Sequence, residues 1–256
     1  MKTAYPIQGY SFLEKLGQSS HAEVFKVCRQ GESDRPLVLK IINPNIGSGD
    51  LHSGLRQQIE YLKQVDMPGV INPELHNTEG GTSFLVQEFF DGRNLNTWRR
   101  SRQDIPISDL LKVLSSITGI LAGIHKAGHI HGGIKPNNIL IAEDTLGIRL
   151  IDLVRVIDVG EISHFIYDED FRKNTLSYIS PEQTGRIRQR VDYTTDLYSL
   201  GVVFYELIGG APPFTSNDPL EVIHSHLAED PIPLNKKSPE APEMLSDIVA
   251  RPALYP

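Results

Sequence analysis

The chain has 256 residues, a net charge of -7 and a pI near 5.7. This acidic balance argues against nucleic acid or an anionic membrane as the main partner. Cys28 is the only cysteine, which excludes an internal disulfide and a multi-cysteine metal site and favours a reducing, cytoplasmic setting. The first ten residues lack the apolar run of a signal peptide, so we expect no leader. The most apolar window, residues 197–210, is too short to span a bilayer and contains Glu206, so we interpret it as a buried helix.

The first ninety residues predict a small lobe of short strands with one helix. β-Branched and aromatic residues cluster in brief segments that are separated by turn residues. Residues 51–65 instead carry apolar residues at helical spacing, and Pro68 follows them. Asp91-Gly92 then marks a turn. Strands are predicted at residues 10–17, 23–29, 36–42, 70–71 and 83–90.

The remainder of the chain predicts a larger, mostly helical lobe. Long apolar stripes end at glycines, and Asp218-Pro219 is a typical helix start. Two short strands are expected at 138–142 and 147–152, followed by an irregular segment up to Glu182. Helices are predicted at residues 108–128, 194–210, 218–228 and 244–250. Ligands usually bind in the cleft between two such lobes.

Three polar residues at strand ends or within strands suggest phosphate chemistry. Lys40 lies in a predicted strand, and the residues on either side of it in that strand are all apolar. Its ammonium group must therefore extend to water or pair with an anion. Asn138 and Asp152 stand fourteen residues apart beside the two later strands. Each alone has an ordinary interpretation as a surface lysine, a turn residue or a strand-ending acid. Together they supply a cation for phosphate oxygens and two oxygen ligands suited to Mg²⁺.

The order of the segments resembles the protein-kinase fold, and specifically bacterial Ser/Thr protein kinase domains. The similarity runs in order and without large insertions over about residues 10–250. The run from Tyr178 to Ile208 is especially similar to kinase domains that open large multidomain signalling proteins, which continue into an ATPase module and often a histidine kinase. The resembling segments are LGQSSHAEVFKV (16–27), LVLK (37–40), LVQEFFDG (85–92), HIHGGIKPNNIL (129–140), IRLIDLV (148–154), TLSYISPEQTGR (175–186) and DYTTDLYSLGVVFYELIGGAPPF (192–214).

This resemblance implies an α+β, bilobal protein-kinase-like fold. A small antiparallel β N-lobe with one helix would occupy residues 10–90 and a hinge residues 88–94. A larger helical C-lobe would occupy residues 95–250. We expect this lobe to be C-terminally truncated relative to the family, with residues 251–256 as a short tail outside the family pattern.

The resemblance also implies ATP and Mg²⁺ as ligands and assigns a role to each matching residue. Lys40 would hold the α- and β-phosphates, Lys135 would approach the γ-phosphate, and Asn138 and Asp152 would bind the Mg²⁺ ions. Adenine would meet the backbone of Glu88 and Phe90 and lie between Val24, Val38 and Leu140, which are also core residues in the absence of nucleotide. Thr175, Glu182 and Asp196 match positions that organise the substrate loop and the catalytic loop.

The sequence departs from the family at the residues that carry the reaction. Gly17 is the one glycine retained in the Gly-rich loop, and Gln58 falls where a helix glutamate normally pairs with the strand lysine. The Arg-Asp pair of the catalytic loop is Gly132-Gly133, so the aspartate that accepts the substrate proton is missing. Val154 replaces a glycine in the metal-binding turn.

Three functions follow from these departures. The first is a bacterial, cytoplasmic pseudokinase that binds ATP and Mg²⁺ and acts through contacts with other signalling proteins, with no nucleic-acid or membrane partner. The second is a weakly active Ser/Thr protein kinase, a transferase that uses Lys135, Asn138 and Asp152 without the usual base. The third is a decayed kinase fragment that binds no nucleotide.

Overall fold

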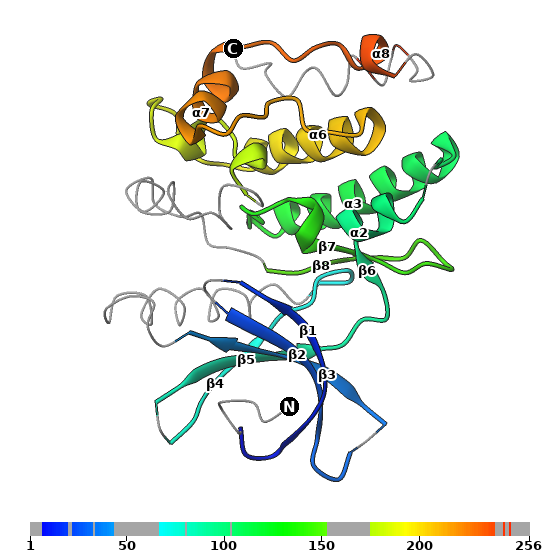
Figure 1. Cartoon of the computed structure of the whole chain (residues 1–256). Helices are drawn as coiled ribbons and strands as arrows, with labels where there is room; N and C mark the ends of the chain where they lie inside the picture. The colour runs from blue at the N-terminus through cyan, green and yellow to red at the C-terminus, as the bar shows by residue number, and fades with distance from the viewer. Residues whose placement is uncertain are drawn as a thin grey trace. The chain divides into compact units, whose positions relative to one another are not determined.

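The computed structural model describes residues 7–19, 22–32, 34–43, 67–79, 81–102, 104–152 and 175–238, together with Glu243 and Ser246. The chain divides into two compact units, one made of Met1–Asp66 and Ile71–Asp91 and the other of Met67–Val70 and Gly92–Pro256 (Figure 1). The helix expected at residues 51–65, with Gln58, lies outside the described residues, as do Val154 and most of the helix expected at 244–250.

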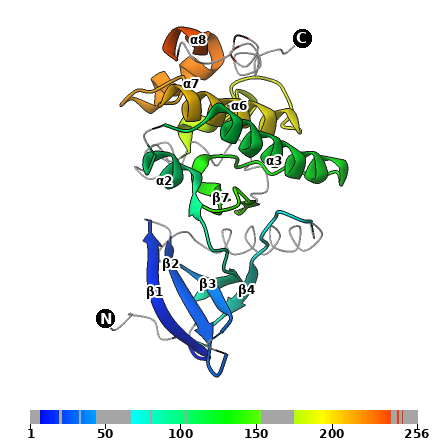
Figure 2. The same ribbon diagram turned by 90° about the vertical axis from the view of Figure 1, so that its right-hand side faces the viewer.

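The first unit is built on a five-stranded antiparallel sheet with the strand order β1-β2-β3-β5-β4 (Figure 2). Four of its strands confirm the predicted segments, whereas the strand expected at residues 70–71 is absent. Val70 belongs to the second unit, where it forms an isolated parallel bridge with Leu150, and Pro73 separates it from the strand that does form. The strands are β1 (Tyr10–Gln18), β2 (Ala22–Arg29), β3 (Pro36–Ile42), β4 (Glu74–Asn77) and β5 (Ser83–Glu88).

One face of this sheet carries the core of the unit. Alternate residues of β2, β3 and β5 point to the same face, as the two-residue period of a strand requires. Phe12 of β1 packs edge-to-face on Phe25 of β2, with ring centroids 5.1 Å apart. The buried residues of this cluster are Ile7, Phe25, Val27, Leu39, Ile41, Phe84 and Val86.

The second unit combines a small sheet with stacked helices. The sheet has the order β6-β7-β8 and is antiparallel, and a two-residue strand and a short helix precede the long helix that was predicted. Asp218 accepts a hydrogen bond from the Leu220 backbone N–H at 2.8 Å, which confirms the predicted helix start. The elements are β6 (Arg93–Asn94), α2 (Leu95–Arg100), α3 (Ile107–Lys126), η1 (Pro136–Asn138), β7 (Ile139–Ile141), β8 (Ile148–Leu150), η2 (Leu176–Tyr178), η3 (Glu182–Thr184), α6 (Thr194–Gly209), α7 (Pro219–Ala228) and α8 (Leu234–Lys237).

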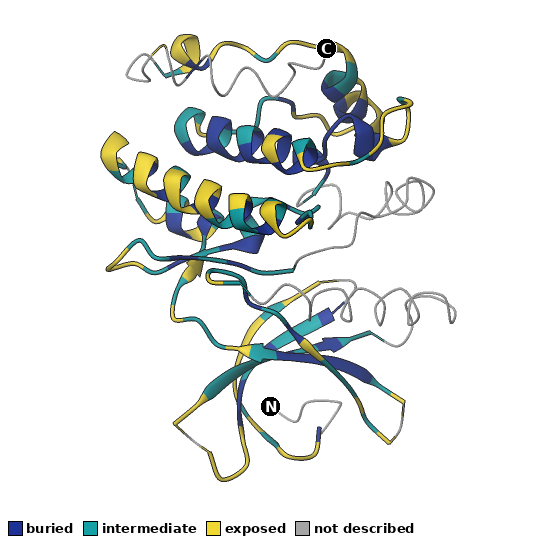
Figure 3. Cartoon of the chain, turned by 180° about the vertical axis from the view of Figure 1, so that it is seen from behind, coloured by how far each residue is buried: buried dark blue, intermediate teal, exposed yellow. Residues whose placement is uncertain are grey.

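Helices α3 and α6 differ in how much of their surface is buried (Figure 3). Most of α6 is buried, and it ends at Gly210, whose φ of 82° is left-handed. Helix α3 packs against β8 and α6 through one stripe of apolar residues: Leu110, Val113, Ile117, Leu121 and Ile124. Within the described residues, α3 is long and apolar enough to cross a membrane by length and composition alone. Its single buried stripe is typical of a helix that packs in a core.

Candidate active site

In the first unit, the predicted nucleotide residues share the face of the sheet opposite the core. Val24 of β2 pairs with Lys40 of β3, and Val38 lies two residues before Lys40 on the same strand. All three are half-buried, whereas Phe25, Leu39 and Ile41 on the other face are buried. Lys40 therefore lies on a sheet face with apolar neighbours, and its contact with nucleotide stays a prediction.

The other predicted adenine contacts lie at the end of the last strand and in the second unit. Glu88 is the last residue of β5 and is exposed, and Phe90 follows it beyond the strand. Leu140 is the half-buried middle residue of β7 between the buried Ile139 and Ile141. The residues predicted to contact the nucleotide thus divide between the two units.

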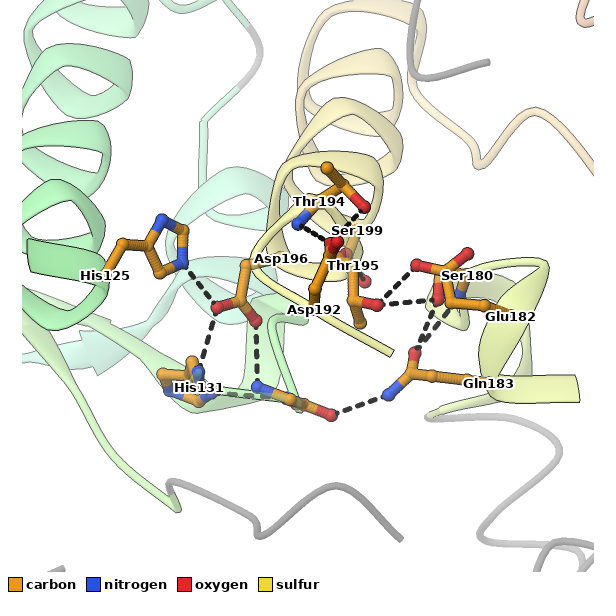
Figure 4. Close-up of polar contacts among 12 residues, drawn as sticks. His125, His131, Ser180, Glu182, Gln183, Asp192, Thr194, Thr195, Asp196 and Ser199 are labelled. Carbon is orange, nitrogen blue, oxygen red and sulfur yellow. Dashed lines mark hydrogen bonds and ion pairs between the residues drawn. The ribbon is translucent and has the colours of Figure 1, made fainter. Parts of the chain in front are cut away.

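The catalytic loop of the second unit is attached to α6 through one buried carboxylate. Asp196 has no exposed surface and accepts hydrogen bonds from the backbone N–H groups of His131 and Gly132, both at 2.8 Å (Figure 4). His125 of α3 places its Nε2 atom 2.8 Å from the same carboxylate. Charge-assisted hydrogen bonds are stronger than neutral ones, so Asp196 fixes the loop where residues 131 and 132 enter it.

His131 is fully buried beside this carboxylate. Burial lowers the pKa of His131, and the negative charges of Asp196 and Asp152 counteract the shift only in part. The imidazole is therefore held neutral, and its Nδ1 accepts a hydrogen bond from the Gly133 backbone N–H at 3.3 Å. A neutral histidine at this point supports the loop backbone without adding charge.

The two glycines that replace the family's Arg-Asp pair differ in backbone conformation. Gly132 has a φ of 71°, in the left-handed region that a side chain disfavours. Gly133 does not have a positive φ, so its backbone is compatible with a side chain. Position 133 therefore lacks the carboxylate because glycine has no side chain, and its φ is not in the left-handed region.

Asn138 and Asp152 are brought together by the strands that follow the loop. Asn138 is 5% exposed and donates from Nδ2 to the Gly133 carbonyl at 2.9 Å, which leaves its amide oxygen as the atom suited to a cation. Its backbone carbonyl accepts a hydrogen bond from Ile151 at 3.0 Å, directly before Asp152. Asn138 and Asp152 carry oxygen atoms of the kind that Mg²⁺ prefers as ligands, and their role in binding that ion stays a prediction.

Asp152 adopts an unusual backbone conformation for a residue with a side chain. Its φ of 54° is left-handed, which costs about 1–2 kcal/mol for residues other than glycine. Aspartate tolerates this region better than most residues, and strained residues of this kind cluster at functional sites. Leu146, in the turn between β7 and β8, has a similar φ of 55°, so the role of Asp152 as a metal ligand stays a prediction.

Lys135 and Gln183 connect the catalytic loop to the segment around η2 and η3. The Lys135 ammonium donates to the Thr175 hydroxyl at 2.8 Å. Gln183 donates from Nε2 to the Gly132 carbonyl at 3.0 Å and accepts from the Ser180 backbone N–H at 3.0 Å (Figure 4).

The adjacent Glu182 is buried and accepts a hydrogen bond from the Thr195 hydroxyl. The sequence identified Lys135, Thr175, Glu182 and Asp196, but it gave no sign of the roles of Gln183 and His125. Their polar side chains stand among helix and loop residues without a periodic signal, so only the contacts reveal them.

A five-stranded antiparallel sheet in one unit and a catalytic loop tied to a buried helix in the other define the class, a protein with the protein-kinase fold. Comparison with known families agrees: residues 10–251 match the protein kinase domain family. The chain belongs to that family.

Curated relatives are bacterial Ser/Thr kinases. A probable serine/threonine-protein kinase of Clostridium perfringens is 26% identical over 94% of this chain and 35% of its own length. The serine/threonine-protein kinase PknL of Mycobacterium tuberculosis is 30% identical over 77% of this chain and 48% of its own length. The chain thus spans only a third to a half of these relatives. A crystal structure of the Mycobacterium tuberculosis PknI kinase domain, solved as a double mutant, matches with a TM-score of 0.72 at 20% identity, over 98% of this chain and 90% of that one.

Proposed function

We propose that this chain is a nucleotide- and Mg²⁺-binding signalling domain of the kinase fold whose phosphotransfer is impaired. The observation that carries the proposal is the contrast inside the catalytic loop. Lys135 and Asn138 keep their side chains and polar contacts, whereas Gly133 offers no group that could accept a proton. We infer that such a domain acts in the cytoplasm through contacts with other signalling proteins.

The loss of the base sets a limit to the rate without abolishing binding. A positioned general base contributes about 10²–10⁴-fold to the rate, or roughly 3–5 kcal/mol of barrier. A bound Mg²⁺ ion would neutralise the negative charge that develops on the phosphate oxygens. Lys40, Asn138 and Asp152 are the residues that would hold the phosphates and the metal. The hydrogen bond from Asn138 to Gly133 is made to the backbone carbonyl, so it does not need a side chain at position 133.

A thermal shift assay tests nucleotide binding. At ATP·Mg²⁺ ten times above the dissociation constant, binding adds about 1.4 kcal/mol to the free energy of unfolding, which corresponds to a shift of roughly 3–6 °C at this chain length. We expect Lys40→Ala and Asp152→Asn to remove the shift. Lys236→Ala, at an exposed lysine of α8, should keep it. A wild-type protein that does not shift at millimolar ATP would favour the decayed fragment.

A transfer assay tests the missing base. Because Gly133 does not have a positive φ, an aspartate can be introduced there without backbone strain. We expect Gly133→Asp to raise transfer of labelled γ-phosphate by at least about tenfold, whereas Gly133→Asn, which cannot accept a proton, should not. An equal response to both substitutions would contradict the assignment of Gly133 as the vacant base position.

The second candidate is a weakly active Ser/Thr protein kinase. Its support is the set of curated relatives, which are named serine/threonine-protein kinases, and the loose transition state of phosphoryl transfer, in which metal and positioning carry much of the catalysis. This candidate predicts measurable transfer by the wild-type chain that Lys40→Ala stops. Transfer below the detection limit of a purified-protein assay would exclude it in favour of the impaired domain.

A further inference from the structure

Three arginines lie in the five residues from 186 to 190, shortly after η3. Arg186, Arg188 and Arg190 are all exposed, and in the described part of the chain none of their side chains has a hydrogen bond or an ion pair. Some other exposed basic residues do have such partners, as Lys15 has in Glu23 and Arg93 has in Glu143. In a chain of net charge -7, this loop is a local concentration of unpaired positive charge.

The loop that carries the arginines is fixed at its base. Gly185 turns the chain with a left-handed φ of 69° and donates to the Glu182 carbonyl at 3.2 Å. The Arg186 backbone N–H donates to the Thr184 hydroxyl at 3.3 Å. Ile187 is half-buried, whereas Arg186 and Arg188 on either side of it are exposed. The backbone is therefore held at the start of the loop, where Arg186 begins the cluster, and a held backbone loses less entropy on binding.

In the described part of the chain, the acidic residue after the loop makes no ion pair with the three arginines. Asp192 accepts hydrogen bonds from the backbone N–H and the hydroxyl of Thr194 at 2.8 and 2.6 Å (Figure 4). Its carboxylate is thus engaged at the start of α6. Exposed apolar side chains follow at once, with Tyr193 55% and Leu197 46% exposed. Positive charge is therefore followed along the chain by apolar surface, a combination found where polypeptide segments bind.

The base of the loop also contacts the catalytic loop. Gln183 lies two residues before Gly185 and reaches the Gly132 carbonyl at 3.0 Å. The arginines that would hold a ligand therefore follow, within a few residues, a glutamine that contacts the catalytic loop. This connection distinguishes the cluster from an isolated charged loop on the surface.

We propose that Arg186, Arg188 and Arg190 form a docking site for an acidic polypeptide segment of a partner protein. Arginine binds carboxylates through its planar fork of donors. A polypeptide is favoured over a nucleic acid because the net charge of -7 repels an extended polyanion, while a short acidic segment meets only the local positive charge. The site needs no nucleotide, so this proposal and the nucleotide proposal can fail separately.

The test uses fluorescence anisotropy with a labelled peptide of alternating glutamate and serine, in the absence of ATP. A peptide with lysine in place of glutamate serves as the ligand control. The loop variant combines Arg186→Glu, Arg188→Glu and Arg190→Glu. The matched variant combines three exposed basic positions outside the loop with the same change in charge: Arg29→Glu, Arg35→Glu and Lys236→Glu.

We expect the loop variant to bind the acidic peptide about tenfold more weakly, on the scale of three exposed ion pairs. The matched variant should bind within about twofold of wild type, and the lysine peptide should not bind. Affinity should also fall with added salt, because exposed charges are screened. Thermal melts of both variants serve as the control for folding. If the loop variant does not fold, Arg186→Gln, Arg188→Gln and Arg190→Gln replace it, with the same expected direction.

Three results would overturn the proposal. The first is the absence of binding of the acidic peptide to wild type. The second is an equal loss of affinity in the loop and matched variants, which would mean that only the net charge matters. The third is equal binding of a single-stranded oligonucleotide that is lost in the loop variant, which would make the loop a general polyanion site.

Discussion

Replacing Asp196 by asparagine changes the charge and the hydrogen bonding of the catalytic-loop anchor while keeping its shape. One carboxylate oxygen accepts from the His131 N–H and lies 2.8 Å from His125 Nε2, and the other accepts from the Gly132 N–H at 2.8 Å. Asparagine has only one acceptor oxygen. Either orientation of its amide directs an NH₂ group at a backbone N–H of the loop, so at least one buried donor loses its partner.

The cost follows from two contributions. A hydrogen bond to a charged group contributes about 1.5–3 kcal/mol, and a buried donor left without a partner costs about 1–3 kcal/mol. Because Asp196 has no exposed surface, water cannot replace the lost acceptor. Asp196→Asn is therefore expected to lower the free energy of unfolding of the second unit by about 2–5 kcal/mol, a large share of the roughly 5–15 kcal/mol of a typical domain.

Urea unfolding followed by circular dichroism measures this loss, and hydrogen exchange at the amides of His131 and Gly132 localises it. Asp192→Asn is the matched control, because Asp192 is an exposed acceptor at the start of the same helix. Asparagine also serves as an acceptor at a helix start, so this control should stay within about 0.5 kcal/mol of wild type. If Asp196→Asn unfolds at the same urea concentration as the control, the anchoring role is wrong.

Three further changes have defined outcomes. Gly132→Ala, at a φ of 71°, should cost about 1–2 kcal/mol in urea unfolding, and no loss would contradict the observed backbone. Burial lowers the pKa of His226 to about 4. Below about pH 6.5 the unfolded chain therefore binds more protons at this histidine than the folded chain does. The free energy of unfolding should fall by about 2 kcal/mol by about pH 5. Melting curves between neutral pH and pH 5 should show a smaller loss of stability in His226→Gln than in wild type. Gly69→Ala would place Cβ 2.6 Å from Ile120 and should destabilise more than Gly81→Ala, which meets no atom within 4 Å at a similar φ; equal melting temperatures would refute the clash.

Strands in which buried and half-buried residues alternate were predictable from the sequence. Strands without this alternation were not. In β2 and β3, buried residues such as Phe25 and Leu39 alternate with half-buried ones, and this two-residue period indicates a strand directly. The four residues of β4 include Glu74, His76 and Asn77, so they have no apolar alternation to detect. Val70 has the composition of a strand residue, but its partner is Leu150, eighty residues further along the chain. Pairing over such a separation is not encoded in a local pattern.

The candidate site was predictable as a set of positions, and its contacts were not. The period of β3 places Val38 and Lys40 on one face, and the resemblance to kinase domains supplies their roles. The contacts of Asp196 with residues 131 and 132 join segments 65 and 64 residues apart, and such distances leave no trace in a single sequence. No sequence pattern distinguishes Gln183 from other polar loop residues. Only its hydrogen bond to the Gly132 carbonyl shows that it supports the catalytic loop.

These contacts explain how the backbone of the catalytic loop is held in place although residues 132 and 133 have no side chains. Asp196 binds the Gly132 N–H, Gln183 binds the Gly132 carbonyl, and Asn138 binds the Gly133 carbonyl. All three contacts are made to backbone atoms, so none depends on which side chains stand at positions 132 and 133. The glycine at 132 also relieves the strain that a left-handed φ imposes on other residues. The absence of the base is therefore a chemical difference within a backbone path that other residues hold in place, and Gly133→Asp asks about chemistry rather than about folding.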